Sequence, residues 1–251
     1  MELLIVSDLE GLSGVERWEA CRPAHPLYPA TVERYVAEVE AISRAAMRLG
    51  IGRTALLDWH GRTLSVDRLG PTVRPALLPF DRAARVAVLL GFHARTGQPE
   101  SFAAHTYRPG LRILWDGREA GELALASRWL GERGVPLVLV TGDRGLTREA
   151  EEWTEQTATV AVKRALAPDR AESLPPARAH EAIATALERV LLRRSWWWVY
   201  RPEVPVAWEV RTPEGKRVDL VAPSVEAALE RLRALVPSVS LPWSAQPEGS
   251  R

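Results

Sequence analysis

Short apolar runs alternate with a long amphipathic stretch near the start of the chain. The runs Leu3–Val6, Ala55–Leu57 and Val86–Leu90 are apolar throughout, which is typical of parallel strands buried on both faces. Between the first two runs, Ala30–Leu49 places apolar side chains at helical spacing and is followed by Gly50, a common helix stop. Strands separated by helices predict an α/β fold: a three-layer, mostly parallel sheet with helices on both faces.

The alternation continues through the middle of the chain. Leu111–Trp115 and the residues after Asp116-Gly117 predict a hairpin, because Asp-Gly favours a tight turn. Helices are predicted at Glu122–Arg133 and Leu146–Glu152. Strands are predicted at Pro136–Val140 and Thr159–Val162. These elements extend the predicted α/β part to about residue 168.

The pattern changes after residue 168. Helices are predicted at Ala177–Arg193 and Ser224–Leu235, and strands at Trp196–Tyr200, Ala207–Arg211 and Arg217–Val221. The tail from Pro237 carries Pro, Ser and Gly and is expected to fray. We therefore predict two domains, a larger α/β domain over residues 1–168 and a smaller α+β domain over residues 169–251.

Composition and charge narrow the class of protein. The 251 residues are 46% hydrophobic, enough for a sizeable core, and carry a formal net charge of +1, which gives no basis for binding nucleic acid or an anionic membrane surface. Cys21 is the only cysteine, so an internal disulfide and a thiolate-rich zinc site are excluded. The amino terminus lacks a basic signal-peptide region, and no apolar run approaches the roughly 20 residues that span a bilayer. We expect a cytoplasmic protein with no membrane partner.

Side chains that can bind metals follow the predicted strands. Asp8 and Glu10 come after the first strand. His60 follows the second strand and His93 the third, whereas Glu122 stands at the start of a predicted helix. In open α/β sheets, ligands collect beyond the carboxyl ends of the strands, so we expect these side chains to converge on one metal centre and predict the α/β domain to be the catalytic one.

Each of these residues also has an ordinary structural explanation. A carboxylate after a strand often caps the next turn, and a glutamate at a helix start is stabilised by the helix dipole. A lone histidine is usually a core or loop residue whose ring nitrogens are hydrogen-bonded. Together, three carboxylates and two imidazoles suit two divalent cations that share a carboxylate, and imidazole suits zinc. Such a pair can hold a hydroxide at neutral pH and polarise a carbonyl. The residues alone thus predict metal-assisted hydrolysis of an unspecified bond.

Further polar residues lie near this set in the sequence. His105 is twelve residues past His93 and adds a third imidazole to the same loop region. Asp58 is placed either to orient His60 or to cap the end of the preceding strand. Asp143 follows a later strand and has the same two interpretations.

The order of these motifs resembles the zinc-dependent D-aminopeptidase family of the DppA type. The family's amino-terminal signature matches Ser7-Asp8-Leu9-Glu10-Gly11-Leu12-Ser13-Gly14. Its later motifs match, in the same order, Asp58-Trp59-His60, Gly91-Phe92-His93-Ala94-Arg95, Ala104-His105-Thr106 and Gly121-Glu122-Leu123. The resemblance covers about residues 1–190.

The resemblance implies an aminopeptidase that releases a D-residue from the amino end of short peptides. It implies His105 as the catalytic histidine. It also implies a ring-like homo-oligomer that encloses its active sites, with a decamer as one candidate size. The implied cofactor is two zinc ions per chain, or other divalent metals, held by Asp8, Glu10, His60, His93 and Glu122.

The chain departs from the family pattern at several positions. Trp59 stands where the family has a small residue, so we expect it to reshape the pocket and to favour a small first side chain such as D-alanine. Ala104 and Thr106 replace serines beside the implied catalytic histidine. Asp143 is followed by Arg144 where the family has a second aspartate. Trp59 and Asp143 are thus candidates for contact with a ligand side chain or with the substrate, as is Asp58.

Two other functions fit the same residues. One is metal-dependent hydrolysis of another amide or of an ester. The other is a non-catalytic peptide- or metal-binding protein on the same scaffold. The complete ligand set argues against the second, because a binding module needs no two-metal group.

Overall fold

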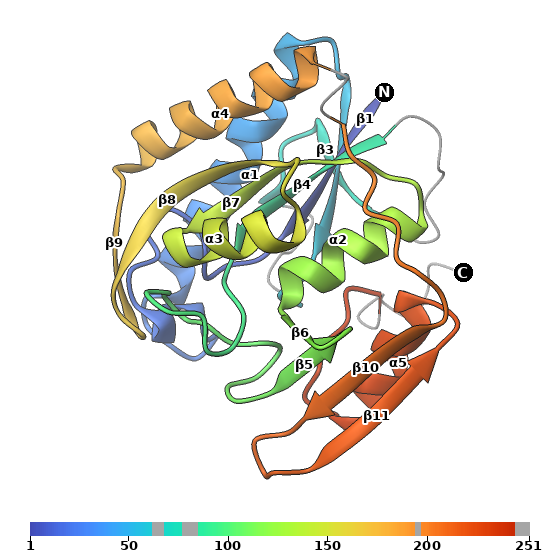
Figure 1. Ribbon diagram of the computed structural model, residues 1–251. Helices are drawn as coiled ribbons and strands as arrows, with labels where there is room; N and C mark the ends of the chain where they lie inside the picture. Colours follow the sequence, from blue (N-terminus) through green and yellow to red (C-terminus); the bar gives the residue numbers. More distant parts are fainter. Residues whose placement is uncertain (62–67, 77–84, 194–196, 244–251) are drawn as a thin grey trace.

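The larger of two sheets forms the centre of the molecule (Figure 1). The computed structural model describes residues 1–61, 68–76, 85–193 and 197–243, and within them this sheet has seven strands in the order β3-β2-β1-β4-β7-β8-β9. Every neighbouring pair is parallel except β8 with β9. The strands are β1 (Glu2–Ser7), β2 (Arg53–Asp58), β3 (Val73–Pro75), β4 (Arg85–Phe92), β7 (Leu137–Asp143), β8 (Ala158–Ala167) and β9 (Arg170–Ser173).

Helices cover both faces of this sheet. The residues of α1 and α4 share one core with the sheet, and those of α2 and α3 share another on the opposite face (Figure 1). No helix in the described ranges is long and apolar enough to cross a membrane. The bounds are η1 (Trp18–Cys21, a 3-10 helix), α1 (Tyr28–Arg48), α2 (Glu122–Glu132), α3 (Arg144–Trp153) and α4 (Pro176–Leu192).

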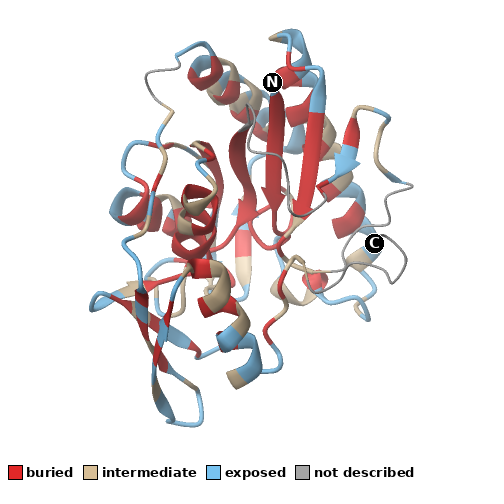
Figure 2. Ribbon diagram, turned by 90° about the vertical axis from the view of Figure 1, so that its right-hand side faces the viewer, coloured by how far each residue is buried: buried red, intermediate tan, exposed pale blue. Residues whose placement is uncertain are grey.

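The central strands are buried on both faces, as their apolar runs predict. In β1, Leu3 and Ile5 belong to the core with α1 and α4. The alternate residues Leu4 and Val6 belong to the core with α2 and α3, because successive side chains of a strand point to opposite faces. Figure 2 shows these strands almost wholly buried between their helices. The predicted three-layer α/β architecture is confirmed.

A smaller antiparallel sheet lies beside the larger one, in the order β11-β10-β5-β6. Helix α5 (Val225–Leu235) packs on it, and its core is continuous with the core under α2 and α3. The strands are β5 (Arg112–Trp115), β6 (Arg118–Ala120), β10 (Val206–Arg211) and β11 (Arg217–Ala222). The predicted hairpin at Asp116-Gly117 and the predicted α+β character of the last part of the chain are confirmed.

Each of the two sheets contains strands from before and from after residue 168. Strands β5 and β6 precede this point but pair with β10, whereas β9 and α4 follow it but belong to the larger sheet and its helices. The proposed division into domains at residues 1–168 and 169–251 stays a prediction.

Some predicted elements differ from the structure. Among residues 197–200 there is no strand, and Trp198 forms an isolated bridge with Leu137; residue 196 lies outside the described residues. Beyond this single bridge at its first residue, β7 pairs with β4 and β8 on its two sides, so no place beside it is open to a longer strand. The tail was expected to fray from Pro237, which is wrong for the part described, because Val239 and Leu241 are buried. Residues 244–251 of the tail lie outside the described residues.

Candidate metal centre

Three adjacent parallel strands bring the site residues together. Strand β1 pairs with β2 on one side and β4 on the other, so the carboxyl ends of all three lie at one edge of the sheet. Asp8 and Glu10 follow β1, His60 follows β2 and His93 follows β4. Glu122 is the first residue of α2. The predicted convergence of the strand ends is therefore what the structure shows.

Two glycines allow the loop after β1 to lie against the end of β4. Gly11 donates its N–H to the carbonyl of Gly91 at 2.7 Å. A Cβ at Gly11 would come within 2.0 Å of the Phe92 carbonyl oxygen, so no side chain fits there. Gly91 has φ of +69°, a conformation that glycine adopts without strain. This close packing carries the Asp8 and Glu10 side chains to the imidazole of His93.

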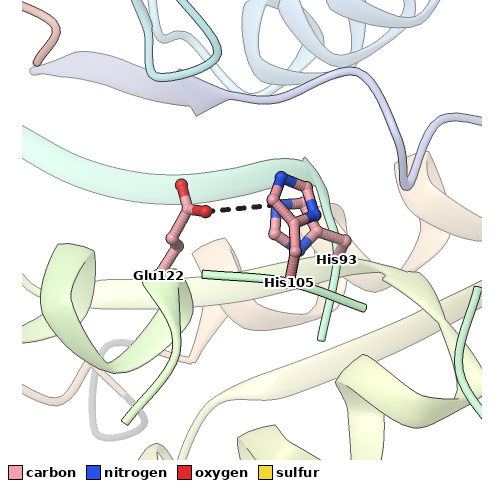
Figure 3. A group of neighbouring side chains, drawn as sticks. All are labelled: His93, His105 and Glu122. Atoms are coloured by element: carbon pink, nitrogen blue, oxygen red, sulfur yellow. Dashed lines mark ion pairs between the residues drawn. The ribbon is translucent and has the colours of Figure 1, made fainter. Parts of the chain in front are cut away.

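The carboxylates and imidazoles are in direct contact. His60 Nδ1 lies 3.0 Å from Asp8 Oδ1 and 3.2 Å from Glu10 Oε2. His93 Nε2 lies 3.5 Å from Asp8 Oδ2 and 3.4 Å from Glu122 Oε1, the latter pair drawn in Figure 3. Asp8 thus stands between two imidazoles, with one carboxylate oxygen toward each.

His105 joins this group from a different loop. Its ring stacks on that of His93, with centroids 3.8 Å apart and planes 12° from parallel (Figure 3). His105 Nδ1 lies 2.7 Å from the Ala103 carbonyl oxygen, and His93 Nδ1 lies 3.0 Å from that of Ala94. Each Nδ1 therefore donates to a carbonyl, which leaves each Nε2 with its lone pair for a metal or a proton.

The charges in this group shift one another's pKa values. Burial and the nearby Glu10 raise the pKa of Asp8 to about 7. Burial alone would lower the pKa of His93, but Glu122 and Asp8 raise it to about 10. Burial alone would raise the pKa of Glu10, but His60 lowers it well below its ordinary value. The geometry thus holds charges of both signs in a buried place.

The residues present fit divalent cations. Asp8 and Glu10 are each 2% exposed and Glu122 is 4% exposed, and buried carboxylates are costly unless positive charge compensates them. The donors are oxygen and nitrogen, which suits zinc. Ligand-type atoms within 4.8 Å of one another form two groups in the described residues, one of His93, His105 and Glu122 and one of Asp8, Glu10 and His93.

Two neighbouring residues hold the Glu122 carboxylate. Trp59 Nε1 donates to Glu122 Oε2 at 2.9 Å, and the Tyr107 N–H donates to Oε1 at 2.6 Å. Trp59 is 1% exposed and its ring packs near Phe92 and Trp129. The structure thus places Trp59 in contact with a candidate ligand. Tyr107 was missed by sequence reasoning, although it lies two residues after His105.

The aspartates Asp58 and Asp143 bond to backbone groups. Asp58 Oδ1 accepts the N–H of Gly61 at 3.0 Å, in the loop that carries His60. Asp143 caps α3 by accepting the N–H of Leu146 at 2.8 Å, and it accepts the N–H of Phe102 at 2.7 Å. Through these bonds Asp58 shapes the loop after β2, and Asp143 holds the loop that leads to His105.

Lys163 supports the loop after β1 through two hydrogen bonds to its backbone. Sequence reasoning did not identify this role. This residue of β8 is 4% exposed, and its Nζ donates to the backbone carbonyls of Glu10 at 2.7 Å and Val15 at 2.5 Å. Burial lowers its pKa to about 8. Its position in the sequence, within an alternating strand, shows no sign of this contact.

A cavity of about 220 Å³ opens onto the site. Its walls are Asp8, Trp59, His60, His93, His105, Tyr107, Glu122, Ser238 and Ser240. The two serines belong to the segment after α5, which no motif in the sequence pointed to.

Comparison with known proteins agrees with this architecture. The chain is 28% identical over 191 residues to the D-aminopeptidase of Bacillus subtilis (strain 168), an alignment of 71% of this chain and 69% of that protein. The fold matches the solved structure of the Zn-dependent D-aminopeptidase DppA from Bacillus subtilis, described as a self-compartmentalizing protease, with a TM-score of 0.85, 20% identity, and coverage of 97% of this chain and 98% of that one. The model of the Peptidase M55 family, described as D-aminopeptidase, matches residues 1–233. The chain therefore belongs to the peptidase M55 family of D-aminopeptidases.

Proposed function

We propose that this chain is a dinuclear-zinc aminopeptidase that releases an amino-terminal D-residue from short peptides. The observation that carries the proposal is the group of three buried carboxylates, the buried His93 and the half-buried His60 at the ends of β1, β2 and β4 and the start of α2. Membership of the D-aminopeptidase family supports the same activity.

Five residues would hold the two cations: Asp8, Glu10, His60, His93 and Glu122. Asp8 is suited to be shared between them, because its two oxygens face different imidazoles. Bound divalent cations supply polarisation of the scissile carbonyl and a lowered pKa of water. Trp59 and Tyr107 keep the Glu122 carboxylate in one orientation, as residues around a metal site commonly do.

His105 is proposed to move the proton. Its Nδ1 donates to the Ala103 carbonyl, so its Nε2 can accept a proton from the attacking water and give it to the leaving amine. In that reaction a C–O bond forms at the peptide carbonyl, the C–N bond breaks and the leaving residue departs with a free amino group. The stacking of His105 on His93 keeps the ring beside the candidate ligands.

The cavity suits a free amino group rather than a blocked one. Its carboxylates offer a partner to an ammonium, and an acetylated peptide would leave such a carboxylate without it. We further propose a ring-like homo-oligomer, a decamer being one candidate size, that admits short peptides and excludes folded proteins. The description of DppA as self-compartmentalizing supports this assembly.

Elemental analysis and a substrate panel test the proposal together. We expect about two zinc ions per chain, and cleavage of D-alanyl dipeptides in preference to L-alanyl and N-acetyl-D-alanyl dipeptides. Equal cleavage of free and acetylated peptides would favour hydrolysis of another amide or ester. Bound zinc without any hydrolysis would favour a non-catalytic binding protein, and no bound zinc would contradict the whole proposal.

A further inference from the structure

One wall of the site cavity has no part in the proposed metal binding or proton transfer. Ser238 and Ser240 line this wall, in the segment that follows α5. The family match ends at residue 233, so the segment lies beyond the family-matched residues. These serines are therefore not among the family motifs matched in the sequence.

The segment packs directly beside the loop that carries a candidate ligand. A Cβ on Gly61 would come within 2.5 Å of Ser240 Oγ, so the two pieces of chain are in close contact. Gly61 is the residue after His60. Ser240 is thereby held at the edge of the candidate metal centre.

Buried neighbours fix the position of the two serines. Val239 is 3% exposed and Leu241 is 0% exposed, and both belong to the core that α2 and α5 share. The Val239 N–H donates to the Val236 carbonyl at 2.9 Å, so the chain turns at Pro237 and Ser238 before it reaches Ser240. With Val239 and Leu241 in the core, the two serines lie between the site cavity and a neighbouring cavity bounded by Glu230 and Arg233, and they line both.

The end of the segment is tied to the residues that support Glu122. The Trp243 ring stacks on Trp129, with centroids 5.4 Å apart and planes 14° from parallel. Trp129 in turn meets Trp59 edge-on at 6.1 Å, and Trp59 donates to the Glu122 carboxylate. The wall and the candidate metal centre are thus parts of one packed unit.

The serine hydroxyls differ chemically from the carboxylates and imidazoles of the cavity. Each can donate and accept a hydrogen bond without carrying charge, which suits the amide and terminal carboxylate of a peptide's leaving residue. The carboxylates of the site suit the amino end instead. We propose that Ser238 and Ser240 form the subsite for the leaving residue and that the Ser238–Trp243 segment limits the length of the peptide. This inference rests on the proposed aminopeptidase function.

Two substrates separate binding of the leaving residue from the chemistry. D-alanyl-glycine has a leaving residue, whereas D-alanine amide releases ammonia and has none. In the double variant S238A/S240A we expect KM for the dipeptide to rise roughly tenfold with kcat nearly unchanged, because two hydrogen bonds are lost. Both parameters for the amide, and the zinc content, should stay at wild-type values. The matched control is S173A on β9, which β7 and β8 separate from the site strands.

A second variant tests the proposed subsite by filling it with a larger side chain. In S238F the phenyl ring should occupy the subsite, so cleavage of the dipeptide should fall by at least tenfold while cleavage of the amide persists. Wild-type KM for the dipeptide in S238A/S240A, or equal loss on both substrates in the two variants, would overturn the inference. Failure of the wild type to cleave either substrate would instead overturn the proposed function, and the inference with it.

Discussion

The edge of the larger sheet and the smaller sheet bury opposite kinds of side chain. At the edge, the carboxylates of Asp8, Glu10 and Glu122 are each no more than 4% exposed. In the smaller sheet, Trp115 and Trp208 are 5% and 2% exposed, with ring centroids 5.4 Å apart. The two regions belong to the same fold, yet one buries carboxylates and the other buries aromatic rings and keeps its ion pairs outside the core.

This contrast separates the residues that stabilise the fold from those that carry out its chemistry. Burying a large apolar side chain stabilises a fold by about 1.5–3 kcal/mol, whereas burying a carboxylate costs stability unless positive charge compensates it. Groups of the second kind are commonly retained for function at the expense of stability. Substitutions at the edge should therefore remove activity without unfolding the protein. Substitutions in the core of the smaller sheet should lower stability without changing the activity of the folded chain.

The largest effect is expected from removing a carboxylate at the edge. In Glu122→Ala we expect fewer than two zinc ions per chain and no detectable turnover, because the residue contacts His93 and lies in a candidate ligand group. Elemental analysis and a peptide assay measure both. The control is Glu151→Ala, a change at an exposed glutamate of α3. Two tightly held zinc ions in Glu122→Ala would contradict the assignment.

Removing the stacked imidazole should separate chemistry from metal binding. His105→Ala is expected to lower kcat by about 10²–10⁴-fold, the usual contribution of a proton-transferring group, with zinc content unchanged. His180→Ala on α4 serves as the matched control. Because His105 also lies within reach of Glu122 and His93, loss of one zinc ion with retained activity would make it a ligand instead.

In the smaller sheet the expected effect is on stability. Trp208→Ala should lower the free energy of unfolding by about 3–5 kcal/mol, as is typical when a buried aromatic ring is removed. Urea unfolding measures this loss, and kcat per folded chain should not change. Trp198→Ala, at a ring that is 51% exposed, should stay within about 0.5 kcal/mol of wild type. A large loss of kcat in folded Trp208→Ala would remove the contrast between the regions.

The smallest effect is expected at Glu38, a buried carboxylate outside the candidate ligand groups. It should appear as a change of the unfolding free energy with pH. Burial raises the pKa of Glu38 from 4.5 to about 7, although it accepts the Ser13 N–H and lies near Lys163. The folded state thus holds this proton more tightly than the unfolded state, so its stabilising contribution is complete below pH 4.5 and is lost as pH rises through 7.

The variant Glu38→Gln should lack this dependence. Relative to the variant, the wild type should lose about 2 kcal/mol of unfolding free energy between about pH 5 and pH 8. Urea unfolding at several pH values provides the comparison. A constant difference between the two proteins across that range would show that Glu38 does not titrate in the folded protein.

The sequence predicted the edge of the larger sheet well. Strands buried on both faces show as apolar runs, and polar residues directly after such runs are conspicuous, as Asp8, His60 and His93 are. Parallel strands then bring these ends together without any further information. Glu122 starts a helix that the pattern also predicts, a position that the helix dipole explains by itself, and it was the Gly121-Glu122-Leu123 motif that marked it as a ligand.

Contacts between distant parts of the chain could not be predicted. Lys163 and the two serines of the cavity wall reach the site through pairing and packing that leave no local pattern. The three-residue β3 and four-residue β9 are too short for a periodic signal. Conversely, the aromatic run ending at Tyr200 has the composition of a strand, but β7, which it meets at one bridge, is already paired with β4 and β8.

The order in which the cavity's parts are synthesised follows from the place of its serine wall. All candidate ligands have been synthesised once Glu122 has been translated, and β1, β2 and β4, which position them, are then complete. Ser238 and Ser240 are synthesised more than a hundred residues later, after β10, the strand that pairs with β5. The residues proposed to hold the metals are thus synthesised before the wall proposed to receive the leaving residue. Completion of the cavity therefore depends on the segment that follows α5.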